Sequence, residues 1–143
     1  MKIAFQMDPI GDVNINADSS FRLAEEAQAR GHELFFYGPD HLAYQEGRIT
    51  ARGHDFTVKR VQGEHVEFGP LREVDLAEYD VVWLRQDPPF DMSYITATHL
   101  LERLEGKTLV VNDPKWVRDC PEKILPLDYP DLMPAMFISR DRQ

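Results

Sequence analysis

The alternation of apolar and polar positions predicts strands and helices that follow one another along the chain. Residues 2–7 are predicted to form a short apolar strand that ends in the turn-rich quartet 8–11. Asp18 is an N-cap for a helix whose apolar positions recur at helical spacing until Gly31 supplies a left-handed stop. Residues 34–37 are a second unbroken apolar run, which is typical of a strand covered on both faces. Strand, helix, strand is therefore the predicted opening unit.

The middle of the chain changes character twice. Between residue 40 and about residue 66, polar and apolar residues alternate, which predicts a half-exposed antiparallel extension. Residues 81–84 are another unbroken apolar run and predict a return to parallel strands. The next segment, residues 85–91, contains Pro88 and Pro89, which are excluded from the interior of a strand or a helix. This strand is therefore expected to end in a rigid loop.

One more helix and one more strand are predicted before a proline-rich tail. The apolar side chains after Asp91 fall at the spacing of one helix face, and Gly106 ends that helix. Those apolar positions are Tyr94, Ala97, Leu101 and Leu104. Residues 109–111 are predicted to form a fourth buried strand. The tail that begins at Pro121 is interpreted as a connector, because it contains several further prolines.

Together these elements predict an α/β fold, namely a Rossmann-like, open and mostly parallel sheet with helices on both faces and an antiparallel extension. The predicted domain covers residues 1–120, and residues 121–143 form the connector. Ligands of such sheets bind in loops at the carboxyl ends of the strands. The candidate loops are residues 8–16, 85–91 and 112–118.

Composition narrows the classes of partner. The 143 residues, 43% of them hydrophobic and 29% charged, suit one globular domain. Sixteen Lys and Arg stand against 25 Asp and Glu, a net charge of −9 without a basic run, which argues against nonspecific binding to nucleic acid or to an anionic membrane. No apolar run reaches the length of a membrane span, and the first 30 residues lack a signal-peptide stretch. The single cysteine, Cys120, excludes an internal disulfide and a multi-thiolate zinc site, and favours a reducing cytoplasm.

Several familiar motifs are absent or incomplete. The triplet 106–108 resembles the end of a phosphate-binding P-loop, but Leu101 stands where that motif needs glycine, and Lys107 precedes a strand. No glycine-rich dinucleotide fingerprint follows the first strand. The five histidines are not spaced as metal ligands on one helix, so no metal site is predicted from them. Cys120 has only Arg118 as a nearby basic residue, which disfavours a reactive thiolate, and it is interpreted as structural or incidental.

Two charged residues at predicted strand ends are candidates for binding. Asp8 could hold a ligand amine or a metal, or it could simply brace the turn that it makes with Pro9. Arg85 follows an apolar strand directly, so its guanidinium should project from the carboxyl edge of the sheet, where it could bind a carboxylate in bidentate fashion. The competing interpretation is a salt bridge from Arg85 to Asp87 or Asp91.

Read together, the loops and the first helix resemble the N-terminal domain of bacterial glutathione synthetases. The matching segments occur in the order of that family across essentially the whole chain, and the Asp-Pro-Pro-Phe-Asp loop is the most specific of them. They are MDPI at 7–10, DSSF at 18–21, EAQARGHEL at 26–34, RQDPPFD at 85–91, VNDP at 111–114, RD at 118–119 and EK at 122–123.

The resemblance implies a domain that precedes an ATP-grasp fold in a ligase. Such an enzyme phosphorylates the cysteinyl carboxylate of γ-glutamylcysteine and lets glycine attack the acyl phosphate, which gives glutathione, ADP and phosphate. By this resemblance Arg85 binds a substrate carboxylate, while Asp8, Asn14 and Ser19 line the same cleft. Lys123 corresponds to the lysine that reaches the phosphates of ATP, and the family favours a homo-oligomer.

The sequence also departs from that family. The family continues beyond this chain's last residue, Gln143, with a glycine-rich lid and with the side chains that hold magnesium. ATP and Mg²⁺ are thus expected to be held mainly outside these residues, no catalytic residue is assigned within them, and the 143-residue chain alone is expected to be inactive. Gln86 stands where many relatives have lysine.

Three rival functions are left open by the residues. The first is the N-terminal domain of another ATP-grasp carboxylate-amine ligase, and the second is a noncatalytic domain that binds a small molecule. The third, a signalling domain of receiver type, is disfavoured because Asp87 is held before Pro88 and Lys107 begins a strand.

Overall fold

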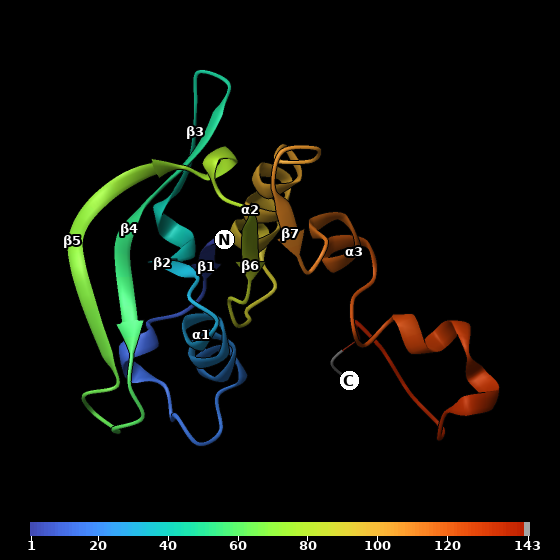
Figure 1. Ribbon diagram of the computed structural model, residues 1–143. Helices are drawn as coiled ribbons and strands as arrows, with labels where there is room; N and C mark the ends of the chain where they lie inside the picture. The colour runs from blue at the N-terminus through green and yellow to red at the C-terminus, as the bar shows by residue number, and fades with distance from the viewer. Residues whose placement is uncertain (142–143) are drawn as a thin grey trace.

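The computed structural model describes residues 1–141, in which seven strands form one sheet (Figure 1). Its parallel half is centred on β1 (Lys2–Gln6), which pairs with β2 (Glu33–Tyr37) on one side and with β6 (Val81–Leu84) on the other. The last strand, β7 (Leu109–Val111), pairs in parallel with β6. These strands confirm the predicted Rossmann-like core of the α/β fold.

The other half of the sheet is antiparallel, as predicted. It contains β3 (Leu42–Gln45), β4 (Arg48–Val58) and β5 (Val66–Asp75), and β4 joins it to β2. The sheet order is β3-β4-β2-β1-β6-β7, with β5 also paired to β4. The extension is longer than the sequence pattern indicated, because β5 begins where the alternation ends. Most side chains of β5 are exposed, so it lacks the apolar signature of a strand.

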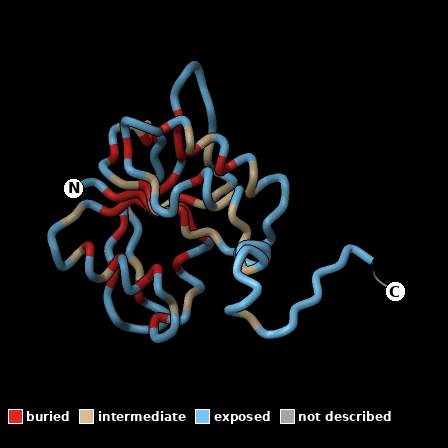
Figure 2. Tube along the Cα trace, turned by 90° about the vertical axis from the view of Figure 1, so that its right-hand side faces the viewer, coloured by how far each residue is buried: buried red, intermediate tan, exposed pale blue. Residues whose placement is uncertain are grey.

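Helices cover both faces of the parallel half, which confirms the predicted layers. On one face, α1 (Ser19–Ala29) buries Phe21 and Ala24 in the core cluster that also contains Phe5 of β1. On the other face, α2 (Met92–Glu102) buries Leu101 in a second core cluster. Successive strand residues point to opposite faces, so β1 supplies both clusters. Figure 2 shows the buried residues gathered around the centre of the sheet.

Aspartate residues cap both helices, Asp18 as the sequence predicted and Asp91 at the residue after which the second helical pattern begins. The Asp18 carboxylate accepts the Phe21 N–H at 2.6 Å, and Asp91 accepts the N–H of Ser93 and of Tyr94 at 2.9 and 3.0 Å. After α1, Gly31 adopts a φ of 76°, the left-handed conformation expected of a helix stop. The predicted boundaries of both helices are therefore correct to within a few residues.

The prediction that residues 109–111 form a buried strand was wrong in one respect. The strand β7 exists, but Leu109 is 62% exposed and Val111 is 36% exposed. The cause is its position, because β7 lies at the edge of the sheet and pairs only with β6. The short helix α3 (Pro114–Asp119) follows β7 and contacts α2.

The tail after Pro121 projects away from the sheet (Figures 1 and 2). It forms two 3-10 turns, Leu125–Asp128 and Pro130–Leu132, and most of its side chains are exposed. Its role as a connector over residues 121–143 stays a prediction, and the last two of those residues lie outside the described part.

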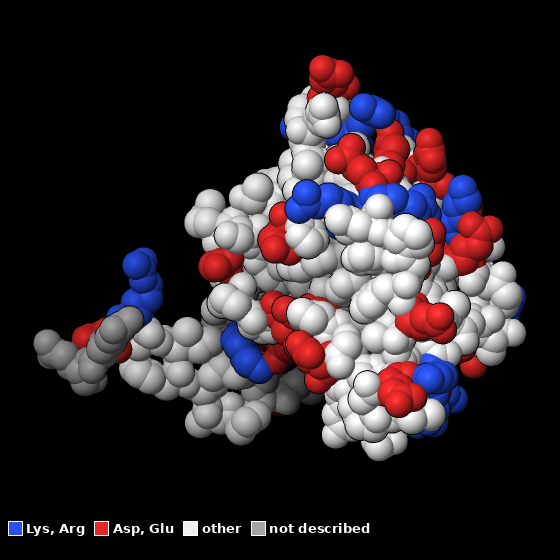
Figure 3. Space-filling model, turned by 90° about the vertical axis from the view of Figure 1, so that its left-hand side faces the viewer, with Lys and Arg blue, Asp and Glu red and all other residues white. Residues whose placement is uncertain are grey.

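On the opposite side of the molecule, acidic and basic side chains lie beside one another around β4 and β5 (Figure 3).

Candidate functional site

Arg85 leaves the carboxyl end of β6 and reaches the start of α1. Its backbone N–H donates to the carbonyl of Gln6 at 2.8 Å, which continues the pairing of β6 with β1 by one residue. The guanidinium Nε donates to Ser20 Oγ at 3.0 Å, and Nη2 donates to Ser19 Oγ at 2.5 Å. The structure thus brings Arg85 and Ser19, two of the residues singled out from the sequence, into direct contact.

The Arg85 guanidinium is held by hydroxyls and not by a carboxylate. Among the described residues Arg85 forms no ion pair, so the competing interpretation of a salt bridge to Asp87 or Asp91 was wrong there. Asp91 instead caps α2. Because serine hydroxyls orient the guanidinium without neutralising it, its positive charge stays available to an anion.

Asp8 lies beside this loop, at the carboxyl end of the neighbouring strand β1. Its Oδ2 accepts the backbone N–H of Asp87 at 2.6 Å. Asp8 therefore braces the loop that follows Arg85, rather than only the turn that it makes with Pro9. The Asp8 side chain is exposed, and within residues 1–141 it has no cationic partner.

An open depression of about 620 Å³ lies in front of Arg85. It is lined by residues 15–19 together with Arg22, Leu23, Arg60 and Arg85. Arg60 comes from the turn between β4 and β5, and Arg22 from the first turns of α1. Three guanidinium groups from three separate segments therefore face one hollow.

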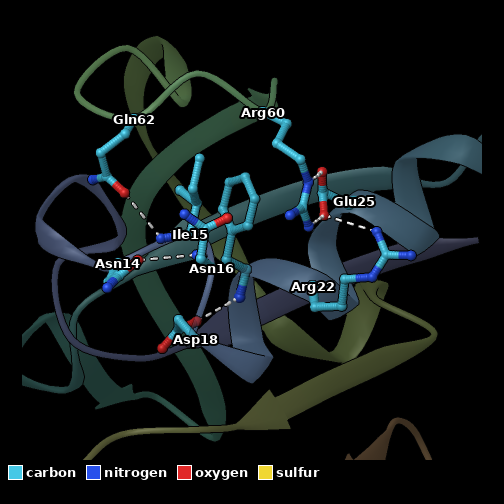
Figure 4. A network of polar contacts seen from close by, with 9 residues as sticks. Asn14, Ile15, Asn16, Asp18, Arg22, Glu25, Arg60 and Gln62 are labelled. Atoms are coloured by element: carbon cyan, nitrogen blue, oxygen red, sulfur yellow. Dashed lines mark hydrogen bonds and ion pairs between the residues drawn. The ribbon is translucent and has the colours of Figure 1, made fainter.

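Two of these guanidinium groups share one carboxylate, Glu25 (Figure 4). Arg60 contacts both Glu25 oxygens, at 2.9 and 2.5 Å, and Arg22 contacts Oε2 at 2.9 Å. The two hydrogen bonds from Arg60, together with the one from Arg22, lower the pKa of Glu25 from 4.5 to about 2. Arg22 and Arg60 are thus partly neutralised, whereas Arg85 is not.

The loop before α1 is held from two sides (Figure 4). Asn14 Oδ1 accepts the Asn16 N–H at 3.0 Å, which closes the turn locally. Gln62, from the turn between β4 and β5, accepts the Ile15 N–H at 3.1 Å and donates to the Val13 carbonyl at 3.1 Å. Asn14 therefore shapes this loop, but it is not among the residues that line the depression.

Lys123 lies elsewhere, in the exposed tail. Its side chain is 83% exposed, and its ammonium group contacts the neighbouring carboxylate of Glu122, whose pKa it lowers. It is not among the residues that line the depression beside Arg85. Within residues 1–141, no group of three or more His, Cys, Asp or Glu side chains is arranged to hold a metal ion.

Arg60 lines the depression, whereas Tyr94 lies outside its lining but within electrostatic reach of Asp87, Arg85 and Asp8, and sequence reasoning assigned neither residue to the site. Tyr94 is half-buried in the first turn of α2, where burial raises the pKa of its phenol. The carboxylates of Asp87 and Asp8 raise that pKa further, and Arg85 lowers it. A phenol with a raised pKa is a hydrogen-bond donor at neutral pH. The only sequence signal for Tyr94 was its place on the apolar face of the predicted helix, and Arg60 had none.

The sequence matches the family described as "Prokaryotic glutathione synthetase, N-terminal domain" over residues 1–118. The chain belongs to this family. Among its curated relatives, glutathione synthetase of Brucella melitensis is 55% identical over 143 residues, all of this chain and 46% of the relative. The Mesorhizobium japonicum enzyme is 54% identical over 141 residues, and the Escherichia coli enzyme 40% identical over 143 residues. Each match covers 99% of this chain and 45% of the relative.

Family membership confirms the resemblance seen in the loops. The comparisons also show how much of each relative this chain covers. The chain spans about half the length of the curated relatives that it matches. The segments that carry the resemblance include the loop from Arg85 to Asp91, which bears the unneutralised guanidinium. In the described part of the chain no helix has the length and apolar character needed to cross a membrane.

Proposed function

We propose that this chain is the substrate-side domain of a glutathione synthetase, an ATP-dependent ligase that joins γ-glutamylcysteine to glycine through an acyl phosphate. The observation that carries the proposal is the guanidinium of Arg85, which two serine hydroxyls orient and no carboxylate of the described residues neutralises. It faces a depression at the carboxyl edge of the sheet. The relatives named glutathione synthetase support the substrate class.

In this proposal the chain binds and orients the dipeptide. Arg85 binds a carboxylate of γ-glutamylcysteine, and the hydroxyl of Ser19 holds the guanidinium in place. Asp8 lies at the same edge of the sheet, next to the depression but not in its lining, and Asn14 sets the shape of the loop before α1. A preorganised cation of this kind contributes binding and orientation of the substrate rather than bond-breaking chemistry.

Residues 1–120 form the substrate-side domain in this proposal, and residues 121–143 connect it to an ATP-grasp domain. ATP with Mg²⁺ would supply the phosphoryl group that activates the substrate carboxylate, and both would be held mainly by that second domain. Lys123 would contribute one positive charge toward the nucleotide phosphates. Its exposed side chain and its position in the tail are compatible with that role.

We also propose a cytoplasmic homo-oligomer. A chain whose sole thiol is Cys120 suits a reducing compartment. Exposed apolar side chains at the β7 edge and on α3, such as Leu109 and Trp116, offer surface for a protein contact. Analytical ultracentrifugation of the complete protein tests the oligomer, and a monomer at micromolar concentration would contradict it.

The experiment compares the 143-residue chain alone with a hybrid. In the hybrid, the chain is joined to the part of the Brucella melitensis relative that lies beyond the matched region. We expect the hybrid to form glutathione from γ-glutamylcysteine, glycine and ATP, and the chain alone to form none. A hybrid that consumes ATP with another carboxylate but not with γ-glutamylcysteine would assign the chain to a different ligase. Glutathione formation by the chain alone would contradict its role as one half of the enzyme.

A further inference from the structure

We propose that Asp8 and Arg85 together bind the α-amino-acid end of the γ-glutamyl group, with Arg85 on its carboxylate and Asp8 on its ammonium group. The inference rests on the proposed function and makes it more specific. Of the two ends of γ-glutamylcysteine, only the glutamyl end carries an ammonium and a carboxylate on one carbon. The cysteinyl end carries a carboxylate next to an amide.

The topology places the two charges at the same edge of the sheet. Strands β1 and β6 are adjacent and parallel, with Gln6 in register with Leu84. Asp8 follows β1 by two residues, and Arg85 follows β6 directly. The bond from the Asp87 N–H to Asp8 Oδ2 ties the two strand ends together.

The two charges share a neighbourhood without neutralising each other. Both act on the phenol of Tyr94, Asp8 raising its pKa and Arg85 lowering it. Within residues 1–141 no ion pair joins Asp8 to Arg85, and neither has another oppositely charged partner. A fixed cation and a fixed anion that stay apart at one edge match a zwitterion, whose own charges are separated by a single carbon.

Their hydrogen bonds leave each group free to take its ligand. Arg85 uses Nε and Nη2 for the two serine hydroxyls, and both of these are neutral partners. Asp8 uses Oδ2 for a backbone N–H, which orients the carboxylate and leaves its charge intact. The same contacts therefore hold the two side chains at fixed positions without placing either of them in an ion pair.

The test uses the full 143-residue chain and measures ligand binding by protein-observed NMR. The ligands are γ-glutamylcysteine, glutarylcysteine, which lacks the ammonium group, and 4-aminobutanoylcysteine, which lacks the α-carboxylate. The variants are Asp8→Asn, whose amide oxygen can still accept the Asp87 N–H, and Arg85→Gln. Asp12→Asn is the matched control, because it removes one exposed negative charge from the same loop.

We expect Asp8→Asn to lower the affinity for γ-glutamylcysteine about tenfold. The affinity for glutarylcysteine should not change, because that ligand has no ammonium group for Asp8 to bind. Arg85→Gln should lower the affinity for γ-glutamylcysteine by a similar factor and leave the affinity for 4-aminobutanoylcysteine unchanged. Asp12→Asn should change neither affinity.

If Asp8→Asn weakens the binding of γ-glutamylcysteine and of glutarylcysteine equally, or weakens neither, the role given to Asp8 is overturned. The proposed function would stay in place in either case. If the unaltered chain binds none of the three ligands, the substrate site itself is misplaced, and the proposed role of this chain fails with it.

Discussion

The carboxylate of Asp8 accepts the backbone N–H of Asp87 across 2.6 Å, although 79 residues separate the two in sequence. This bond joins the loop after β1 to the loop after β6, and Arg85 lies between that junction and the end of its strand. The position of the guanidinium thus depends on a contact between two loops.

Replacing Asp8 by alanine should loosen that junction. We expect Asp8→Ala to lower the free energy of unfolding by about 1 kcal/mol, the usual net value of one hydrogen bond, and to speed hydrogen exchange of the Asp87 amide. Asp8→Asn keeps an acceptor and is the control, with exchange close to that of the unaltered chain. Urea unfolding and NMR exchange measure the two effects. Unchanged exchange at Asp87 in the alanine variant would contradict the contact.

Replacing Arg85 by lysine should keep the charge and lose the geometry. Two guanidinium nitrogens contact two different hydroxyls, and a single ammonium group cannot reproduce that fork. We expect Arg85→Lys to lower the affinity for γ-glutamylcysteine about tenfold, as measured by titration calorimetry. Ser19→Ala, which keeps the cation and one serine contact, should have a smaller effect. Equal affinity of the lysine variant would show that charge alone suffices.

Stability should depend on pH through Glu25. The guanidinium of Arg60, assisted by Arg22, lowers the pKa of Glu25 from 4.5 to about 2 in the folded chain. A carboxylate with a lowered folded-state pKa stabilises the fold above its unfolded pKa, and this contribution is lost as the pH falls through the folded pKa. The window is therefore between about pH 4.5 and about pH 2.

We expect Glu25→Gln to lower the free energy of unfolding at pH 7 by about 1 kcal/mol and to flatten its decline within that window. Chemical unfolding at a series of pH values measures both effects. Glu105→Gln, on an exposed side chain, is the control and should leave the decline intact. A Glu25→Gln variant with the same pH dependence as the unaltered chain would refute the prediction.

Gln62 should control the order of the loop before α1. The Ile15 N–H donates to the Gln62 carbonyl in a part-buried contact, and the net value of such a hydrogen bond is about 0.5–1.5 kcal/mol. We expect Gln62→Ala to destabilise the chain by roughly that amount and to speed exchange of the Ile15 amide. Gln62→Glu retains an acceptor for the Ile15 N–H but places a carboxylate oxygen against the Val13 carbonyl, so its protection of the Ile15 amide should lie between those of glutamine and alanine. Identical exchange in the two variants would contradict this account.

Much of the fold could be predicted from local patterns. The strand at residues 2–6, the helix capped by Asp18 and the helix capped by Asp91 all have signals within a few residues of themselves. The strand β5 could not be predicted, since its side chains are mostly exposed and its pairing with β4 supplies the order that an apolar pattern would otherwise signal. The exposure of Leu109 was likewise missed, because a buried strand and an edge strand of three apolar residues look alike in sequence.

The candidate site divides in the same way. The projection of Arg85 from a strand end could be predicted, because a charged residue directly after an apolar strand lies at the edge of the sheet. Its contact with Ser19 spans 66 residues, and the approach of Arg60 to Glu25 spans 35. No local pattern encodes such pairs, since they form only when separate elements pack together.

The sequence by itself determined the order of the elements, the helix caps, the family and the residues that carry charge at the strand ends. Caps and apolar runs act between near neighbours, so their physical cause is already present in the linear chain. Only the tertiary structure decided which charges are neutralised. Glu25 pairs with Arg60 and Arg22, while Arg85 meets serine hydroxyls. The charge available to a ligand is therefore a property of the packed loops, because neutralisation requires two groups within a few ångströms in space.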